Sequence, residues 1–73
     1  MTEPVTKKIY ITDLNINLTF LGEVKSFENK NENITVLLSN VTVYEYSSSN
    51  YLYSQPEISL SGPASRFHIE DAV

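Results

Sequence analysis

The chain has 73 residues, no cysteine, and nine acidic against five basic side chains, which leave a net charge of −4. This length predicts one small domain, the absence of cysteine excludes disulfides and cysteine-ligated zinc, and the acidic balance argues against a protein that binds phosphates by charge alone. Because there is no apolar run long enough to span a membrane and the start lacks a secretion signal, we expect no membrane partner and a cytoplasmic location.

The start of the chain predicts an arm, a short strand and a turn. Residues 1–7 are polar, so we expect a flexible arm before a single domain over residues 8–73. The isoleucines and tyrosine of Lys8–Ile11 suit a strand. This strand should end in residues 12–15, where Asp and Asn favour a turn.

A longer strand is predicted from Ile16 to Phe27, where apolar and polar side chains alternate. Gly22 interrupts the alternation, which then resumes. A lone glycine inside a strand marks a bend, a bulge or a close backbone approach, so we expect one strongly curved strand and not two. The polar residues 28–33 are predicted to form a loop.

The stretch from Ile34 to Tyr46 is the most strand-like part of the chain, since it is rich in Val, Leu, Thr and Tyr. Ser39 and Asn40 predict a bulge or bend in its middle. Residues 47–50 are polar and predict the tip between this strand and the next.

The C-terminal part predicts shorter strands. Aromatic alternation over 51–54 stops at Pro56 and Glu57 and is followed by the apolar pattern of Ile58–Leu60. Ser61–Ala64 contains Gly and Pro and predicts a tight turn. Arg66–Ile69 is predicted to be the last strand.

No segment shows a helical period, so we predict an all-β fold: a small, strongly bent, five-stranded antiparallel barrel with no or minimal N-terminal helix. A barrel this small leaves sheet edges unpaired. Pairing them with a neighbouring copy protects them and enlarges the core, so we expect a ring or dimer on physical grounds alone.

Catalysis is not predicted. His68 is the only histidine, and a serine–histidine–acid arrangement would need Ser65 or a distant serine beside it, with Glu70 or Asp71 as the orienting acid. No pattern holds these residues in a pocket. Adjacent carboxylates such as Glu70 and Asp71 are common on surfaces, so we expect no enzyme, no metal site and no cofactor.

Four tyrosines, at positions 44, 46, 51 and 53, lie on both sides of the polar tip with a spacing of two. Such side chains stack on nucleic-acid bases in some proteins. Cross-strand aromatic pairing or a subunit contact is the interpretation that we favour, because no lysine or arginine lies between Lys30 and Arg66.

Three short motifs resemble the Sm-like superfamily, which includes the bacterial Hfq proteins. Gly22–Glu28 is similar to the glycine, hydrophobic, aromatic and acidic pattern that opens the first Sm motif. Asn33–Val36 is similar to the segment that opens the third Sm strand, and Leu60–Ala64 occupies the place of the second Sm motif. Order and spacing agree over residues 8–69, and the combination is similar to a divergent, phage-encoded member.

The resemblance implies a homo-oligomeric ring of about five to eight copies that binds single-stranded RNA or DNA. Asn33 matches the base-reading asparagine, and Asn31 occupies the stacking position, which is usually apolar, aromatic or histidine. Ser61 and Gly62 match the turn of the second motif, where the family has arginine and glycine.

Two positively charged residues belong to this candidate site as well. Lys30 and Arg66 are the only cations from residue 26 onward, so they are expected to replace the missing motif arginine.

The family joins its subunits through the fourth and fifth strands, which implies interface residues Ile58, Leu60, Phe67 and Ile69. The leading hypothesis is a non-enzymatic, Sm-like ring for RNA or nucleic-acid processing. The alternative is a structural or protein-interaction module on the same barrel, such as a phage particle component or adaptor.

Overall fold

The computed structural model describes residues 7–72 and confirms the predicted all-β fold. Its elements in chain order are the strands β1 (Lys8–Asp13), β2 (Leu18–Lys30), β3 (Asn33–Glu45) and β4 (Tyr51–Pro63), the 3-10 turn η1 (Ala64–Arg66) and the strand β5 (Phe67–Asp71). The predicted arm over residues 1–7 lies outside the described residues except for Lys7, whose carbonyl accepts a hydrogen bond of 2.9 Å from the Val24 amide. The described part contains no helix able to cross a membrane.

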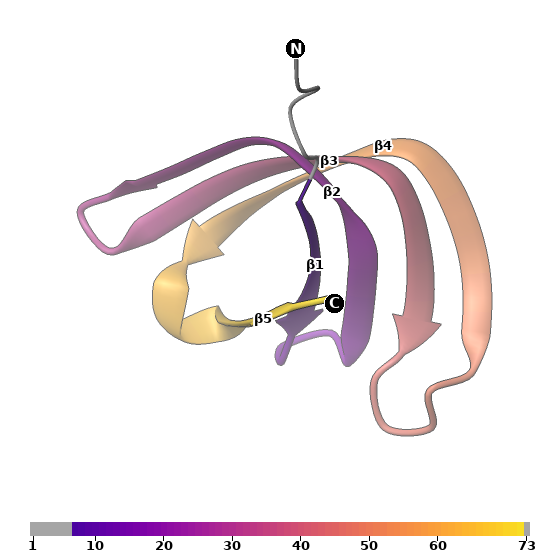
Figure 1. Cartoon of the computed structure of the whole chain (residues 1–73). Helices are drawn as coiled ribbons and strands as arrows, with labels where there is room; N and C mark the ends of the chain where they lie inside the picture. The colour runs from indigo at the N-terminus through magenta and orange to yellow at the C-terminus, as the bar shows by residue number, and fades with distance from the viewer. Residues whose placement is uncertain (1–6, 73) are drawn as a thin grey trace, which may run out of the picture.

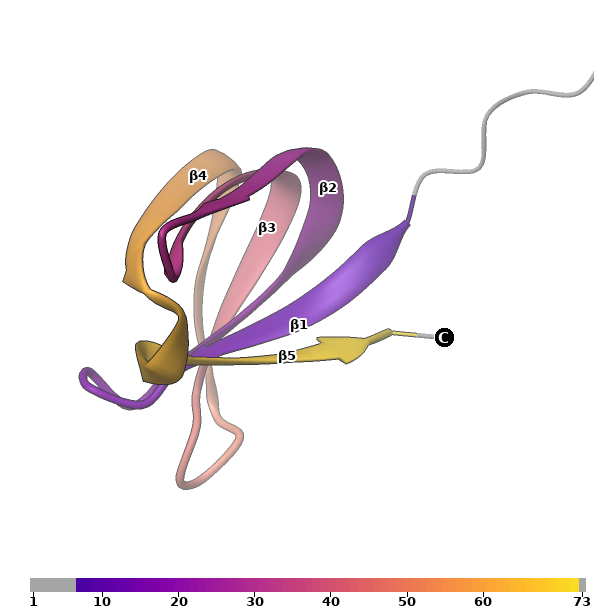
Figure 2. The same cartoon turned by 90° about the vertical axis from the view of Figure 1, so that its left-hand side faces the viewer.

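The strands form one antiparallel sheet in the order β4-β3-β2-β1-β5. β2, β3 and β4 arch together, while β1 and β5 lie beneath the arch (Figure 1). The view in Figure 2 shows that the sheet curls without closing. Because β4 pairs with β3 only and β5 pairs with β1 only within the described residues, both strands have one free edge, and the barrel is open.

β2 passes through Gly22 without a break, as predicted. The register shifts after Leu21, which is opposite Thr42, because Glu23 is opposite Ser39. A β-carbon on Gly22 would lie 3.1 Å from the Ser39 carbonyl oxygen and 3.1 Å from a methyl group of Val41. Glycine is therefore required here because β3 approaches the β2 backbone closely.

The predicted polar loop over residues 28–33 is wrong. Lys30 is directly opposite Asn33, so only Asn31 and Glu32 form the turn. Both have positive φ, 53° and 63°, as a two-residue hairpin turn with the correct twist requires. Residues 25–30 are exposed along the strand, which leaves no buried face to produce an alternating pattern.

The predicted break at Pro56 and turn at Ser61–Ala64 are also wrong, because β4 runs continuously to Pro63. Proline is tolerated at Pro56 because β4 is an edge strand, in which alternate amides point away from the sheet and make no sheet hydrogen bond. Moreover, Gln55 pairs with Val41 and Glu57 with Ser39, which places Pro56 opposite the bulge in β3. The reversal of the chain occurs in η1 instead.

The core lies on the inner face of the bent sheet. Alternate residues of β1, β2 and β3 fill it, because successive side chains of a strand point to opposite faces. Its buried apolar members are Ile9, Ile11, Phe20, Ile34, Val36, Leu38, Val41, Val43 and Phe67, and the partly buried side chains packed against them are Leu18, Val24, Ile58, Leu60 and Ala64.

Candidate nucleic-acid interface

The tip of the β2–β3 hairpin lies against the end of β4. Asn33, the first residue of β3, is opposite Pro63, the last residue of β4. The Ala64 amide also donates a 2.8 Å hydrogen bond to the Glu32 carbonyl, which joins the hairpin turn to η1. This end of the sheet therefore brings together the predicted binding residues Lys30, Asn31, Asn33, Ser61 and Gly62.

The two asparagines at the tip have different roles in the local structure. Asn31 has the positive φ of the turn, a conformation that asparagine tolerates better than most residues. The side-chain amide of Asn33 donates a long hydrogen bond of 3.4 Å to the Asn31 carbonyl. Asn33 is exposed and keeps its side-chain carbonyl oxygen and a second amide hydrogen for a ligand.

Gly62 is required by packing. Its φ of 155° is in the region that L side chains rarely adopt. A β-carbon at this position would lie 3.3 Å from the Phe67 ring and 3.7 Å from Nη1 of Arg66. The sequence predicts Gly62 to be a glycine that lets a nucleotide approach. The backbone conformation and the contact with Phe67 explain the glycine without any nucleotide.

Arg66 forms an ion pair with Asp13. Its Nε donates to both carboxylate oxygens of Asp13, at 2.9 and 3.0 Å, and its Nη2 lies 2.8 Å from Oδ2. The Asp13 side chain is 2% exposed and that of Arg66 is 35% exposed. The hydrogen bonds from Arg66 lower the pKa of Asp13, with help from the Asn15 amide, which donates to Oδ1 at 3.0 Å.

This pairing changes what Arg66 can contribute to a nucleic-acid site. Its charge is offset by Asp13, and the guanidinium also lies 5.6 Å from the centroid of the Phe67 ring. Sequence reasoning missed the pair because it treated Asp13 only as a turn residue. No local pattern links positions 53 residues apart in the chain.

Charge at the tip is balanced. The hairpin segment 25–33 contains two lysines and two glutamates, so its formal charge is zero. Lys30 is exposed at the end of β2 and is the tip's own cation. A phosphate contact at this end of the sheet therefore depends chiefly on Lys30 and on backbone and amide donors.

The predicted interface residues lie on the two edge strands, β4 and β5. Ile58 and Leu60 are partly buried against the core, whereas Ile69 is 38% exposed. Phe67 belongs to the core of its own chain, at 9% exposed. Of the four, Ile69 presents the largest exposed fraction to a partner.

Two other groups of side chains were considered from the sequence. Tyr44 and Tyr51 form an edge-to-face pair with ring centroids 6.3 Å apart, the cross-strand pairing that we favoured. His68 Nε2 lies 2.7 Å from Oε1 of Glu70, and both side chains are exposed. Among the described residues, no group of three potential ligands is arranged to hold a metal ion.

Comparison of the chain with protein-family models, with curated proteins and with solved structures gives no match.

Proposed function

We propose that this chain is a non-enzymatic, Sm-like protein that forms a ring and binds single-stranded RNA, or single-stranded DNA, for nucleic-acid processing in the cytoplasm, which is the host cytoplasm if the gene is phage-borne. The observation that supports this most is the contact between the β2–β3 tip and the end of β4. Asn33 is opposite Pro63, and Gly62 and Ser61 are the two residues of β4 before it, so the residues for which the resemblance predicts nucleotide contacts lie at one end of the sheet.

The exposed Asn33 side chain suits base recognition, since an amide offers one acceptor and two donors to a base edge. Lys30 is three residues before Asn33 and directly opposite it in the hairpin, so one nucleotide can reach both. A single site of this kind is weak. Repeating it around a ring increases the overall affinity by multivalency without any stronger contact.

The free edges of β4 and β5 support ring assembly. In the proposed ring, β4 of one copy pairs with β5 of the next, so that no copy keeps an open edge. Ile58, Leu60 and Ile69 then lie in the joined strands. Phe67 is buried in the core of its own copy, so it supports the interface only indirectly, by holding β5 in place.

A protein-interaction or structural module is the second candidate. The Asp13–Arg66 ion pair favours it, because that pair leaves Lys30 as the principal cation at the tip. The balanced charge of the hairpin favours it as well. The two candidates differ in one measurable property, which is affinity for single-stranded nucleic acid.

We expect labelled oligo-U, oligo-A or oligo-dT to bind at low salt, as measured by fluorescence anisotropy, and to be released steeply as salt rises.

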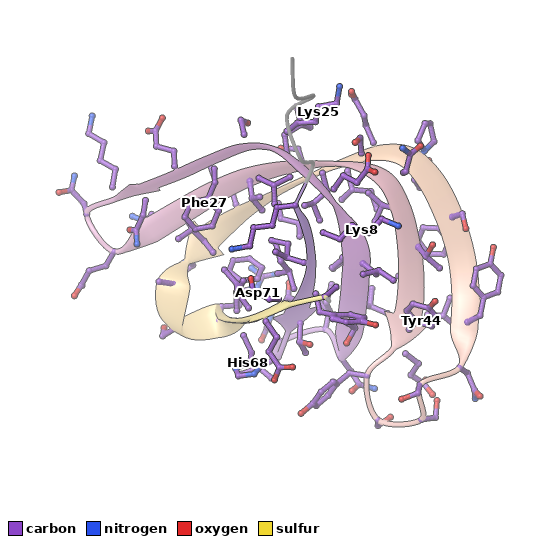
Figure 3. All side chains as sticks on the ribbon, viewed as in Figure 1. Lys8, Lys25, Phe27, Tyr44, His68 and Asp71 are labelled. Atoms are coloured by element: carbon purple, nitrogen blue, oxygen red, sulfur yellow. The ribbon has the colours of Figure 1, made fainter. Side chains whose placement is uncertain are left out.

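Asn33→Ala should reduce discrimination between bases by about 1 kcal/mol per lost base contact. Lys30→Ala should weaken all sequences alike and flatten the salt dependence. Lys25→Ala, which removes a charge from the outer side of the arch, is the matched control and should bind like the wild type (Figure 3).

No rise in anisotropy with any of the three oligonucleotides at low salt would overturn the binding proposal and leave the interaction module. Equal losses in Lys30→Ala and Lys25→Ala would show that binding is not located at the tip.

A further inference from the structure

A groove of about 430 Å³ lies on the opposite face of the sheet from the core, away from the hairpin tip. Aromatic, hydroxyl and acidic side chains from four strands and from the loop between β3 and β4 surround it. The residues that line it are Tyr10, Thr12, Thr19, Tyr44, Glu45, Tyr46, Ser49, His68 and Glu70.

The sheet register explains how this groove forms. Thr12 is opposite Thr19, and their hydroxyl groups are 3.1 Å apart in a hydrogen bond that makes the floor. Thr19 is in turn opposite Tyr44 on β3, and Thr12 is opposite His68 on β5, so these two side chains stand on the two sides. Figure 3 labels Tyr44 and His68 and shows the separation of the two walls.

Three tyrosines define the chemistry of the walls. Tyr10 stands beside Glu70, its partner across β1 and β5, while Tyr44 and Tyr46 stand on the other wall. Tyr46 is 52% exposed and Tyr10 is 39% exposed, so their rings are open to a ligand. The face of an aromatic ring attracts cations, and a desolvated cation gains most from it.

The charges around the groove are acidic. Glu70 and Glu45 contribute carboxylates, and neither lysine nor arginine is among the described residues that line it. Glu70 contacts His68 through one oxygen, Oε1, and Glu45 accepts a hydrogen bond from Ser48 through one oxygen. Each carboxylate therefore keeps a second oxygen for a cationic donor.

We propose that this groove binds an arginine or lysine side chain carried by an extended, basic segment of a partner protein. The combination of tyrosine rings, two carboxylates and hydroxyl acceptors is complementary to a cation with an aliphatic stem. The net charge of −4 also attracts a basic segment from a distance. A nucleic acid is disfavoured here, because phosphates would face the carboxylates of Glu45 and Glu70.

This binding site does not rest on the proposed function. The groove lies within one copy of the chain, and its residues take no part in the tip formed by β2, β3 and β4. Binding of a basic segment and binding of nucleic acid therefore fail independently, since Tyr46 and Glu70 matter for one and Asn33 and Lys30 for the other.

The test is a fluorescence-anisotropy titration with short labelled peptides of Gly and Ser that carry either arginine or the uncharged norleucine, at about pH 8, where carboxylates are ionised. We expect the arginine peptide to bind more tightly and to be released by salt. Tyr46→Leu and Glu70→Gln should each weaken it about two- to fivefold, the change that an exposed cation–π contact or ion pair gives. Glu70→Gln keeps a hydrogen-bond acceptor for His68, and Tyr46→Leu changes an exposed side chain, so both should fold normally.

Tyr53→Leu is the matched control, because Tyr53 is 43% exposed but does not line the groove. Equal affinity for the arginine and norleucine peptides would overturn the proposal. So would a loss in Tyr53→Leu as large as that in Tyr46→Leu, or the absence of arginine-peptide binding at about 1 mM protein.

Discussion

At the end of β1, Asp13 is a carboxylate with almost no exposure to solvent, and its partner comes from the opposite end of the chain. Burying a charge is costly unless it is paired and hydrogen-bonded. Arg66 supplies three contacts, and the Arg66 carbonyl accepts a 3.0 Å hydrogen bond from the Leu14 amide. The ion pair thus attaches η1, and with it the start of β5, to the turn after β1.

Removing the Asp13 carboxylate should destabilise the fold. We expect Asp13→Ala to lower the free energy of unfolding by about 2 kcal/mol, a value for hydrogen bonds to charged groups that allows for the partial exposure of Arg66. Urea denaturation followed by circular dichroism measures it. Asp71→Asn is the control, because Asp71 pairs with Lys7 at the surface and should contribute little. An equal loss in both variants would contradict the assigned role of Asp13.

The same pair predicts a dependence on pH. Arg66 lowers the pKa of Asp13 in the folded state below its unfolded value, so this stabilisation is complete above about pH 4 and is lost as the pH falls through the folded-state pKa. Wild-type stability should therefore fall more steeply below about pH 4 than that of Asp13→Asn, which has no carboxylate to protonate. Parallel curves for the two proteins would contradict this.

β2 and β3 each bend where an irregular residue interrupts the pairing. Gly22 in β2 and Asn40 in β3, which has a φ of 52°, are near each other at the register shift. The bend divides both strands into two parts. One part packs beside β1, and the other ends in the hairpin whose tip meets the end of β4 (Figure 1). In this second part only β2 is exposed along its length, because β3 contributes Ile34, Val36 and Leu38 to the core.

Gly22→Val should disrupt this bend, because even a β-carbon added at Gly22 would lie 3.1 Å from the β3 backbone and 3.2 Å from the Leu38 side chain. We expect a loss of about 1 to 3 kcal/mol in the free energy of unfolding, as in an overpacked core, or failure to fold. Thr35→Val introduces the same valine side chain at an exposed position of β3, where it only exchanges a hydroxyl for a methyl group, and should change stability little. Wild-type stability of Gly22→Val, measured by thermal unfolding, would contradict the close-approach argument.

Sequence patterns correctly predicted those strands that have one buried and one exposed face. The alternation around Gly22 was predicted because core packing leaves a periodic pattern in the sequence, and the bulge at Asn40 because Ser39 and Asn40 are a polar pair inside an apolar strand. The hairpin over residues 28–33 was missed since it is exposed along its length and is held by backbone pairing. Pro56 was misinterpreted because its tolerance depends on β4 being an edge strand, a property of the whole sheet. Asp13 was missed as the partner of Arg66 because no local pattern links two positions 53 residues apart in the chain.

At the scale of the whole molecule, the open sheet leaves edges to which a second copy of the chain can pair. Within residues 7–72, β4 and β5 each present an unpaired edge, and exposed apolar side chains accompany them, including Leu52 and Tyr53 on β4 and Ile69 on β5. Free edges of this kind invite pairing with another strand. A ring of identical copies satisfies every edge at once, whereas a single chain leaves two exposed.

Native mass spectrometry of the purified protein mixed with an oligo-U at low salt tests this account most directly, because it reports the number of chains and the bound oligonucleotide in one spectrum. We predict a single closed assembly of about five to eight chains that carries the oligonucleotide. The same assembly without oligonucleotide would favour the interaction module. A spectrum of single chains without oligonucleotide, at a protein concentration of about 10 µM where stable rings persist, would contradict the account.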